Sequence, residues 1–183
     1  METFVECVPN VSEGRDPETL DAIAAAMEAH AGAWLLDRSA DVDHRRSVYT
    51  LAGYPGRVMA AMEAAVEVAI ERIDMRTHDG HHPRVGAVDV IPFVPLGDTT
   101  MEQCVSGARD FAERLADRFK LPVYLYREAA SRPERRVLAA IRRPGFEGLA
   151  EAMARDGGAP DLGPRRPHPT AGATIVGARP FLI

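Results

Sequence analysis

The fold is decided around Thr77–Pro95, where the sequence reads THDGHHPRVGAVDVIPFVP. Three histidines, an aspartate and a glycine form a polar cluster in its first half, and the apolar second half, AVDVIPFVP, predicts a strand. The segment upstream predicts a helix, because Pro55 suits a first helical turn and apolar residues follow it at helical spacing. The sequence therefore places a polar loop between a helix and a largely apolar strand.

Working outward from this stretch, strands and helices alternate along the chain. Asp16 followed by Pro17 indicates a helix start, and Thr99 or Thr100 caps a later helix. The predicted elements are strand 4–8, loop 10–16, helix 17–29, strand 33–37, a polar loop, strand 46–54, helix 55–73, strand 87–95, helix 99–119, strand 122–128, short helices near 135–141 and 146–154, a Gly/Pro-rich loop over 157–172, and strand 173–183.

The first six elements follow the order β-α-β-β-α-β, which is that of a ferredoxin-like split β-α-β unit. We therefore predict an α+β, ferredoxin-like two-layer sandwich with a mixed, mainly antiparallel sheet, helices on one face, and additional elements after Phe119. At 183 residues the chain is expected to form a single domain over 1–183, with a core that needs no disulfide or metal. The loop over 157–172 is expected to be structured and to lie on the same side of the domain as His82.

Composition narrows the class of protein. The net charge is −5, from 22 basic and 27 acidic residues, so no basic excess indicates nucleic-acid binding. No apolar run has membrane-spanning length, and the N-terminus lacks the pattern of a signal peptide. Cys7 and Cys104 have no C-x-x-C spacing, so two buried, reduced thiols in a cytoplasmic protein are expected.

The cluster His78–His82 admits three interpretations. A zinc site needs three or four converging ligands, and Gly80 and Pro83 oppose a continuous helix that would bring His78 and His82 together. A catalytic base needs one imidazole, and Pro83 favours an extended, well-defined backbone at His82. The third interpretation is a solvated turn. Because most polar groups in loops are simply solvated, residue types alone favour this last one.

A second polar cluster reads DRSADVDHRRS over 37–47. A loop of mixed charge is usually solvated, but Asp41, His44 and Arg46 could also form a site for a polar amino-acid substrate, with arginine binding a carboxylate through two hydrogen bonds. A third cluster, CVPNVSEGRD over 7–16, could hold an anion, although it contains no P-loop or G-x-G-x-x-G pattern.

Five blocks of the sequence, taken together, resemble the glutamate formiminotransferase family, at the N-terminal subdomain of its transferase module. These blocks are VECVPNVSEGRD, DVDHRRSVYTLAG, HHPRVGAVDVIPFVPL, PVYLY and PHPTAGATIVGARPFLI, and they cover nearly the whole chain in the family's order. The resemblance implies transfer of a formimino group between N-formimino-L-glutamate and tetrahydrofolate, in histidine breakdown and one-carbon metabolism. It also implies two tandem ferredoxin-like subdomains with folate in the groove between them, and no metal.

The resemblance also assigns residues. The histidine of the HPR motif, His82 here, is the catalytic base, and a neutral imidazole could accept a proton from the attacking folate amine and return it to the departing glutamate nitrogen. Asp41, His44, Arg46 and Arg84 are the substrate-binding candidates. The folate-binding loop corresponds to Gly163, Pro164, Arg165, Arg166, Pro167, His168, Pro169, Thr170, Ala171 and Gly172.

Three departures from the family pattern leave alternatives open. Arg45 stands where the family usually has asparagine, and His81 where relatives are commonly acidic. Family members continue into a second subdomain, whereas this sequence stops at Ile183. The chain is therefore expected to act with a second subdomain. The alternative is a non-enzymatic folate-binding or interaction domain. A sheet face left uncovered would favour homodimerisation.

Overall fold

The computed structural model describes residues 2–180, so the end of the last predicted strand, 181–183, lies outside the described residues. Its elements are β1 (Thr3–Cys7), β2 (Asn10–Val11), α1 (Pro17–Glu28), β3 (Ala33–Asp41), β4 (Arg46–Gly53), α2 (Pro55–Arg72), β5 (Val88–Gly97), α3 (Met101–Phe119), β6 (Val123–Arg127), α4 (Leu138–Arg142), α5 (Leu149–Ala154) and β7 (Thr174–Ala178), with short 3-10 turns at Met75–Thr77 and Pro133–Arg136. The order agrees with the sequence-based expectation.

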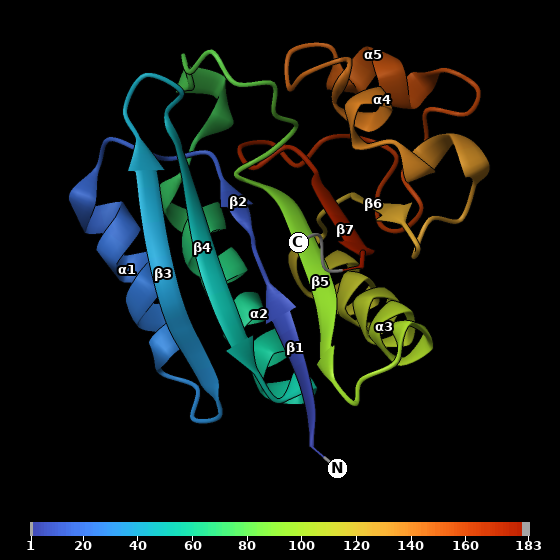
Figure 1. Cartoon of the computed structure of the whole chain (residues 1–183). Coiled ribbons are helices and arrows are strands. Elements are labelled where there is room, and N and C mark those ends of the chain that lie inside the picture. The colour runs from blue at the N-terminus through green and yellow to red at the C-terminus, as the bar shows by residue number, and fades with distance from the viewer. Residues whose placement is uncertain (1, 181–183) are drawn as a thin grey trace.

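Within residues 2–180, all seven strands belong to one mixed sheet (Figure 1). The strands β3, β4, β1 and β5 lie side by side in that order and are antiparallel, and the short β2 continues β1 between β4 and β5. The strands β7 and β6 extend the sheet beyond β5 with parallel pairings. The prediction of an α+β protein with a mixed, mainly antiparallel sheet is confirmed.

Helices α1, α2 and α3 cover one face of the sheet and enclose the larger hydrophobic core (Figure 1). The helix starts follow from their caps: the Asp16 side chain accepts from the Glu18 N–H, and Thr100 and Gln103 form a reciprocal capping box. The largest buried side chains of this core include Tyr49, Phe93, Phe111, Ile23, Met27, Leu51, Met62, Ile91 and Leu115.

A smaller core lies on the opposite face, under α4 and α5. Val90 of β5, Ile175 of β7 and Tyr124 of β6 are neighbours across the strands, and they pack with Leu149 and Met153 of α5. The sequence left the elements after Phe119 unplaced, and their helices prove to lie across the sheet from α1–α3. The apolar side chains of β5, β7 and β6 on this face explain that placement, because they need a cover of their own.

Two segments that we predicted as loops are strands. β3 runs to Asp41 rather than ending at Asp37, and Asn10–Val11 form β2 inside the predicted loop 10–16. The end of β3 is polar because its side chains face solvent, and β2 is only two residues long, with Val11 buried, so neither gives a recognisable alternating pattern although both backbones pair with β4.

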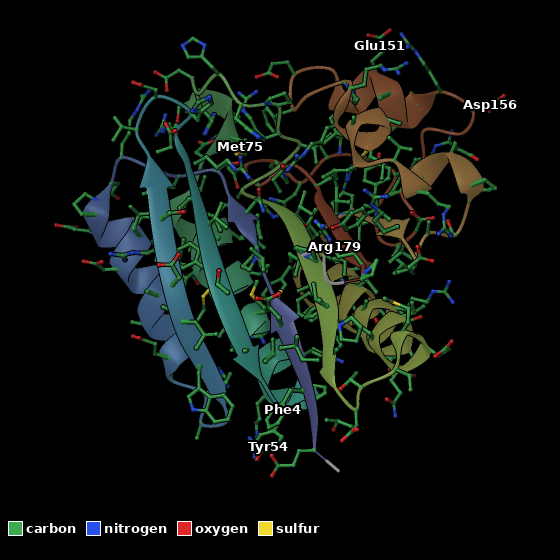
Figure 2. All side chains as sticks on the ribbon, viewed as in Figure 1. Phe4, Tyr54, Met75, Glu151, Asp156 and Arg179 are labelled. Atoms are coloured by element: carbon green, nitrogen blue, oxygen red, sulfur yellow. The ribbon has the colours of Figure 1, made fainter. Side chains whose placement is uncertain are left out.

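Outside the region of α4 and α5, the second face of the sheet is uncovered over β3, β4 and β1 (Figure 1). Its lower end carries Phe4 and Tyr54 (Figure 2). The ring centroid of Phe4 lies 5.2 Å from that of Tyr54 and 6.4 Å from that of Trp34. Trp34 is 49% exposed and Tyr54 43%.

Candidate active site

His82 lies at the upper end of the sheet, beside the first residue of β4. Its Nε2 is 3.0 Å from Nη1 of Arg46, whose other terminal nitrogen donates to the side-chain oxygen of Asn10 in β2. A guanidinium can only donate, so Nε2 of His82 accepts, and the ring is the neutral tautomer that carries its proton on Nδ1. Asn10 and His82 each lie 36 positions from Arg46 in the sequence, and the sheet brings the three side chains together.

The surroundings of His82 favour its neutral form. Burial lowers its pKa to about 4, and the charges of Arg46 and Arg142 act in the same direction. His44 adds a smaller effect of the same sign, because its ring lies edge-on to that of His82 at 6.3 Å between centroids. The imidazole is thus unprotonated at neutral pH, which is the form that a general base requires.

The low pKa of His82 gives the first prediction. We expect an NMR titration of the His82 ring to have its midpoint near pH 4, instead of the 6.5 of a free imidazole. In the unfolded chain the His82 ring takes up a proton near pH 6.5, whereas in the folded chain it does so only near pH 4. Protonation of His82 therefore favours the unfolded state, and the folded state should lose stability as the pH falls from about 6.5 to about 4. Arg46→Gln should move the midpoint upward, because it removes the nearest cation. A midpoint at 6.5 in the parent protein would contradict this description.

Asp41 and His44 form a fixed pair at the β3–β4 turn. The Asp41 carboxylate accepts from the backbone N–H of His44 at 2.8 Å and lies 2.8 Å from His44 Nδ1. The backbone hydrogen bond, and then the side-chain bond, lower the pKa of Asp41. A hollow of about 370 Å³ opens here, and it is lined by Ser39, Ala40, Asp41, His44, Arg46, Val48 and His82. Three of the predicted substrate-binding candidates thus lie around the predicted base.

His78 has a structural position that the sequence did not reveal. It is 8% exposed, its Nε2 is 3.0 Å from the backbone oxygen of Arg45, and its Nδ1 accepts from the backbone of Gly80 and from Arg84. A Cβ at Gly80 would lie 2.3 Å from the backbone oxygen of His44, so only glycine fits between the two loops. His78 and Gly80 therefore hold the histidine-bearing loop against the β3–β4 turn.

Arg84 is engaged within the chain. Its guanidinium donates to Nδ1 and to the backbone oxygen of His78, each at 3.0 Å, and to the Glu147 carboxylate at 2.8 Å. Its side chain is 12% exposed. These contacts tie the loop to the segment before α5.

Arg45 adopts a left-handed backbone conformation, with φ of 46°. This conformation favours asparagine among non-glycine residues, which explains physically why an amide suits this position. The arginine side chain turns to Asp79 at 3.2 Å and to Glu13 at 3.6 Å, and it donates to the backbone oxygen of Thr77. These contacts of Arg45 join the β3–β4 turn to the histidine-bearing loop.

A second prediction concerns Arg45→Asn. We expect the free energy of unfolding to change by less than about 1 kcal/mol, because relief of left-handed strain offsets the loss of the exposed ion pair with Asp79, and the buried Glu13 carboxylate keeps hydrogen bonds from the three backbone N–H groups that follow it. Urea denaturation of the parent and the variant would measure this difference. A loss well above that range would show that Arg45 holds the two loops together more strongly than its contacts indicate.

The predicted folate loop, 163–172, is ordered and lies at the same end of the sheet as His82. The Ala87 N–H donates to the Ala171 oxygen, and Gly86 and Gly172 form a β-bridge, so the loop is fastened directly after the histidine cluster. His168 accepts from the Ala171 N–H through Nδ1, at 3.1 Å. The expectation of a structured loop is met by these hydrogen bonds.

The loop and His82 nevertheless line different hollows. The loop borders a space of about 430 Å³ formed by Phe119, Lys120, Pro164, Arg166, Pro167, His168 and Pro169. This space adjoins the end of α3, which belongs to the helical face, whereas Arg46 lies on the uncovered side of β4. Within residues 2–180, the two parts of the predicted site share an edge of the sheet but no single pocket.

Three other findings bear on the class of protein. Among the described residues, no group of three or more His, Cys, Asp or Glu side chains is arranged to hold a metal ion. Within the same span, the helices are all too short or too polar to cross a membrane. Cys7 and Cys104 are buried free thiols, as predicted.

Comparison with known proteins identifies the family. Residues 4–179 match the family described as formiminotransferase domain, N-terminal subdomain. The chain belongs to the formiminotransferase family. The resemblance found in the sequence is therefore confirmed.

Individual members of the family are similar over the whole chain. The glutamate formimidoyltransferase of Thermoplasma acidophilum is 48% identical over 99% of this chain, and that of Streptococcus pyogenes serotype M1 is 45% identical over 100%. The formimidoyltransferase-cyclodeaminase of Rattus norvegicus is 46% identical over 100% of this chain. The chain spans 60%, 61% and 34% of the lengths of these relatives, respectively.

Proposed function

We propose that this chain contributes to formimino transfer between N-formimino-L-glutamate and tetrahydrofolate, with His82 as the general base. The observation that carries the proposal is a neutral imidazole that lines a hollow together with Asp41, His44 and Arg46, in a member of the formiminotransferase family. Relatives that it resembles are named glutamate formimidoyltransferases.

The chemistry requires one group that first takes and then returns a proton. The folate amine adds to the amidine carbon and loses a proton to Nε2 of His82. The resulting imidazolium then gives that proton to the glutamate nitrogen as the carbon–nitrogen bond breaks. Arg46 must release Nε2 for this step, and its contact with Asn10 offers a position in which it remains held.

For folate we propose the loop 163–172, which offers backbone groups and little side-chain bulk to a flat ring. Lys120 and Arg166 add positive charge at the hollow beside it. Because this hollow is separate from that of His82, a further protein surface would have to complete a path between them. The antiparallel order β3-β4-β1-β5 supports a ferredoxin-like core, and the uncovered face of those strands is the proposed surface for a second subdomain.

A second candidate function is a folate-binding or interaction domain without catalysis, for which a homodimer through the same uncovered face is the corresponding assembly. The exposed side chains of Trp34 and Leu36, at 49% and 62%, favour an association surface in either case. Sedimentation at micromolar concentration separates a monomer from a dimer.

The test is a formimino-transfer assay with tetrahydrofolate, on this chain alone and mixed with the remaining part of a relative's transferase. We expect transfer in the mixture and little or none with the chain alone. Folate binding without transfer, in any mixture that assembles by sedimentation, would favour the non-catalytic candidate instead.

A further inference from the structure

A buried carboxylate and a second arginine lie behind the Arg46–His82 pair, and neither was singled out from the sequence. Asp89 is 3% exposed and sits where β5 carries one extra residue, since Asn10 pairs with Val90 and Val11 with Val88. Such a bulge can redirect a side chain. The Asp89 carboxylate therefore lines the same small cavity as Asn10, Arg46 and His82.

Asp89 holds Arg142, the last residue of α4. One carboxylate oxygen accepts from the Val85 N–H at 2.8 Å, and the other lies 2.5 Å from Nη2 of Arg142. The Arg142 side chain is 14% exposed, so it remains reachable from solvent. A buried ion pair of this kind fixes the guanidinium in place, because separating it would leave a charge without a partner.

The charges in this neighbourhood do not balance. Arg46 and Arg142 are two cations close enough that each opposes the other's charge, and Asp89 is the carboxylate between them. Glu13 is already bound by the backbone N–H groups after it and by Arg45, and Asp41 is bound by His44. Among the described residues, Nε of Arg46, Nε of Arg142 and Oδ2 of Asp89 are buried without a well-directed hydrogen bond, and Oδ2 has only its charge contact with Nη2 of Arg142. Two arginines and one carboxylate leave a net positive charge, which a bound anion would balance.

We infer that Arg142, anchored by Asp89, acts with Arg46 to bind a carboxylate of the amino-acid substrate beside His82. This inference rests on the proposed function, because that function supplies an amino acid with two carboxylates. Arginine is the side chain best suited to this role, since its planar fork matches a carboxylate with two hydrogen bonds. The alternative is a purely structural tie between α4 and β5.

A carboxylate on the two arginines would also act on the base. Both cations lower the pKa of His82, so a bound anion that compensates their charge should raise that pKa toward neutrality. The imidazole would then become a stronger base only when substrate is present. A structural tie has no such effect.

The experiment measures binding of L-glutamate to the full chain by calorimetry, together with the NMR titration of the His82 ring. Arg142→Gln should weaken binding by roughly 10–100-fold, the worth of a lost charge-assisted pair of hydrogen bonds. Arg143→Gln is the matched control, because Arg143 is the exposed neighbour and its variant should bind L-glutamate like the parent. The rise in the His82 pKa on adding L-glutamate should be smaller in Arg142→Gln than in Arg143→Gln.

Arg142→Lys is a second variant, for the case that Arg142→Gln does not fold. It keeps the positive charge opposite Asp89 but lacks the planar guanidinium. We expect a folded protein, checked by circular dichroism, with binding weaker than in the parent. Unchanged L-glutamate affinity in a folded Arg142 variant, no binding to the parent protein, or equally tight binding of inorganic phosphate would each overturn the inference. The transfer assay distinguishes this inference from the proposed function. If transfer occurs but glutamate binding does not depend on Arg142, only this inference is refuted. If glutamate binding depends on Arg142 but no transfer occurs, only the proposed function is refuted.

Discussion

His82→Ala is expected to lower formimino transfer by about two to four powers of ten in a reconstituted enzyme, which is the usual worth of a general base. Folate binding should be largely retained, because the loop 163–172 lines a different hollow and makes its backbone contacts with Gly86 and Ala87. The physical reason for the loss is specific to one atom. Nε2 of His82 is the unprotonated ring nitrogen at the hollow, and alanine leaves only solvent to accept the proton.

His81→Ala is the matched control for this result, since His81 is the exposed neighbour on the same loop. It should retain most of the activity. His78→Ala is a poor control, because His78 is buried and holds Arg45, Gly80 and Arg84 together. Steady-state rates and folate affinity, measured on the same preparations, distinguish the outcomes. Full activity after His82→Ala would refute both the assignment of the base and the mechanism.

Among the variants proposed for this chain, Gly86→Ala is expected to lower the free energy of unfolding most. A Cβ at this position would lie 1.9 Å from the backbone oxygen of Ala173 and 2.5 Å from that of Ala171, and backbone atoms cannot turn aside as a side chain can. Gly86 also accepts a 2.7 Å hydrogen bond from the buried Ser12 hydroxyl. Overpacking commonly costs about 1–3 kcal/mol and occasionally more, and we expect the upper end or beyond.

In a protein of this size, about 3 kcal/mol corresponds to a fall in Tm of roughly 6–12 °C. Gly56→Ala provides the control, because Gly56 lies in the first turn of α2 and a Cβ added there would have nothing within 4 Å. It should leave Tm unchanged or raise it slightly, since alanine favours a helix. A Gly86→Ala variant as stable as the parent would show that the 163–172 loop can separate from Gly86 without loss.

The regular elements were largely predictable because their signals are local. Asp16 with Pro17, and Thr99 or Thr100, predicted two helix starts, and the structure begins α1 at Pro17 and α3 directly after the Thr100 cap. The pairing of β7 between β5 and β6 was not predictable, because the residues of a strand do not specify which strands it pairs with. The position of α4 and α5 on the second face depends on that pairing, so it was hidden for the same reason.

For the candidate site, sequence reasoning brought out the residues with conspicuous chemistry and missed those whose role comes from contacts. Asp41, His44, Arg46 and His82 do gather around one hollow. His78 looked like a spare imidazole, but it proves to be a buried connector. Gly86 allows a close approach to the backbone, and that approach is made by the chain's own residues 171–173. Asp89 and Arg142 come together through a bulge and a tertiary pairing, neither of which leaves a local signal.

The strand order has a consequence for how the chain assembles as it is synthesised. β7 follows every other described strand in the sequence, yet it lies between β5 and β6, so β6 cannot join the sheet until residues 174–178 have left the ribosome. The four strands β3, β4, β1 and β5 lie within the first 97 residues and can form earlier. Until β7 inserts, the apolar edges of β5 and β6 stay open, and a nascent chain held at that point is the form most exposed to aggregation.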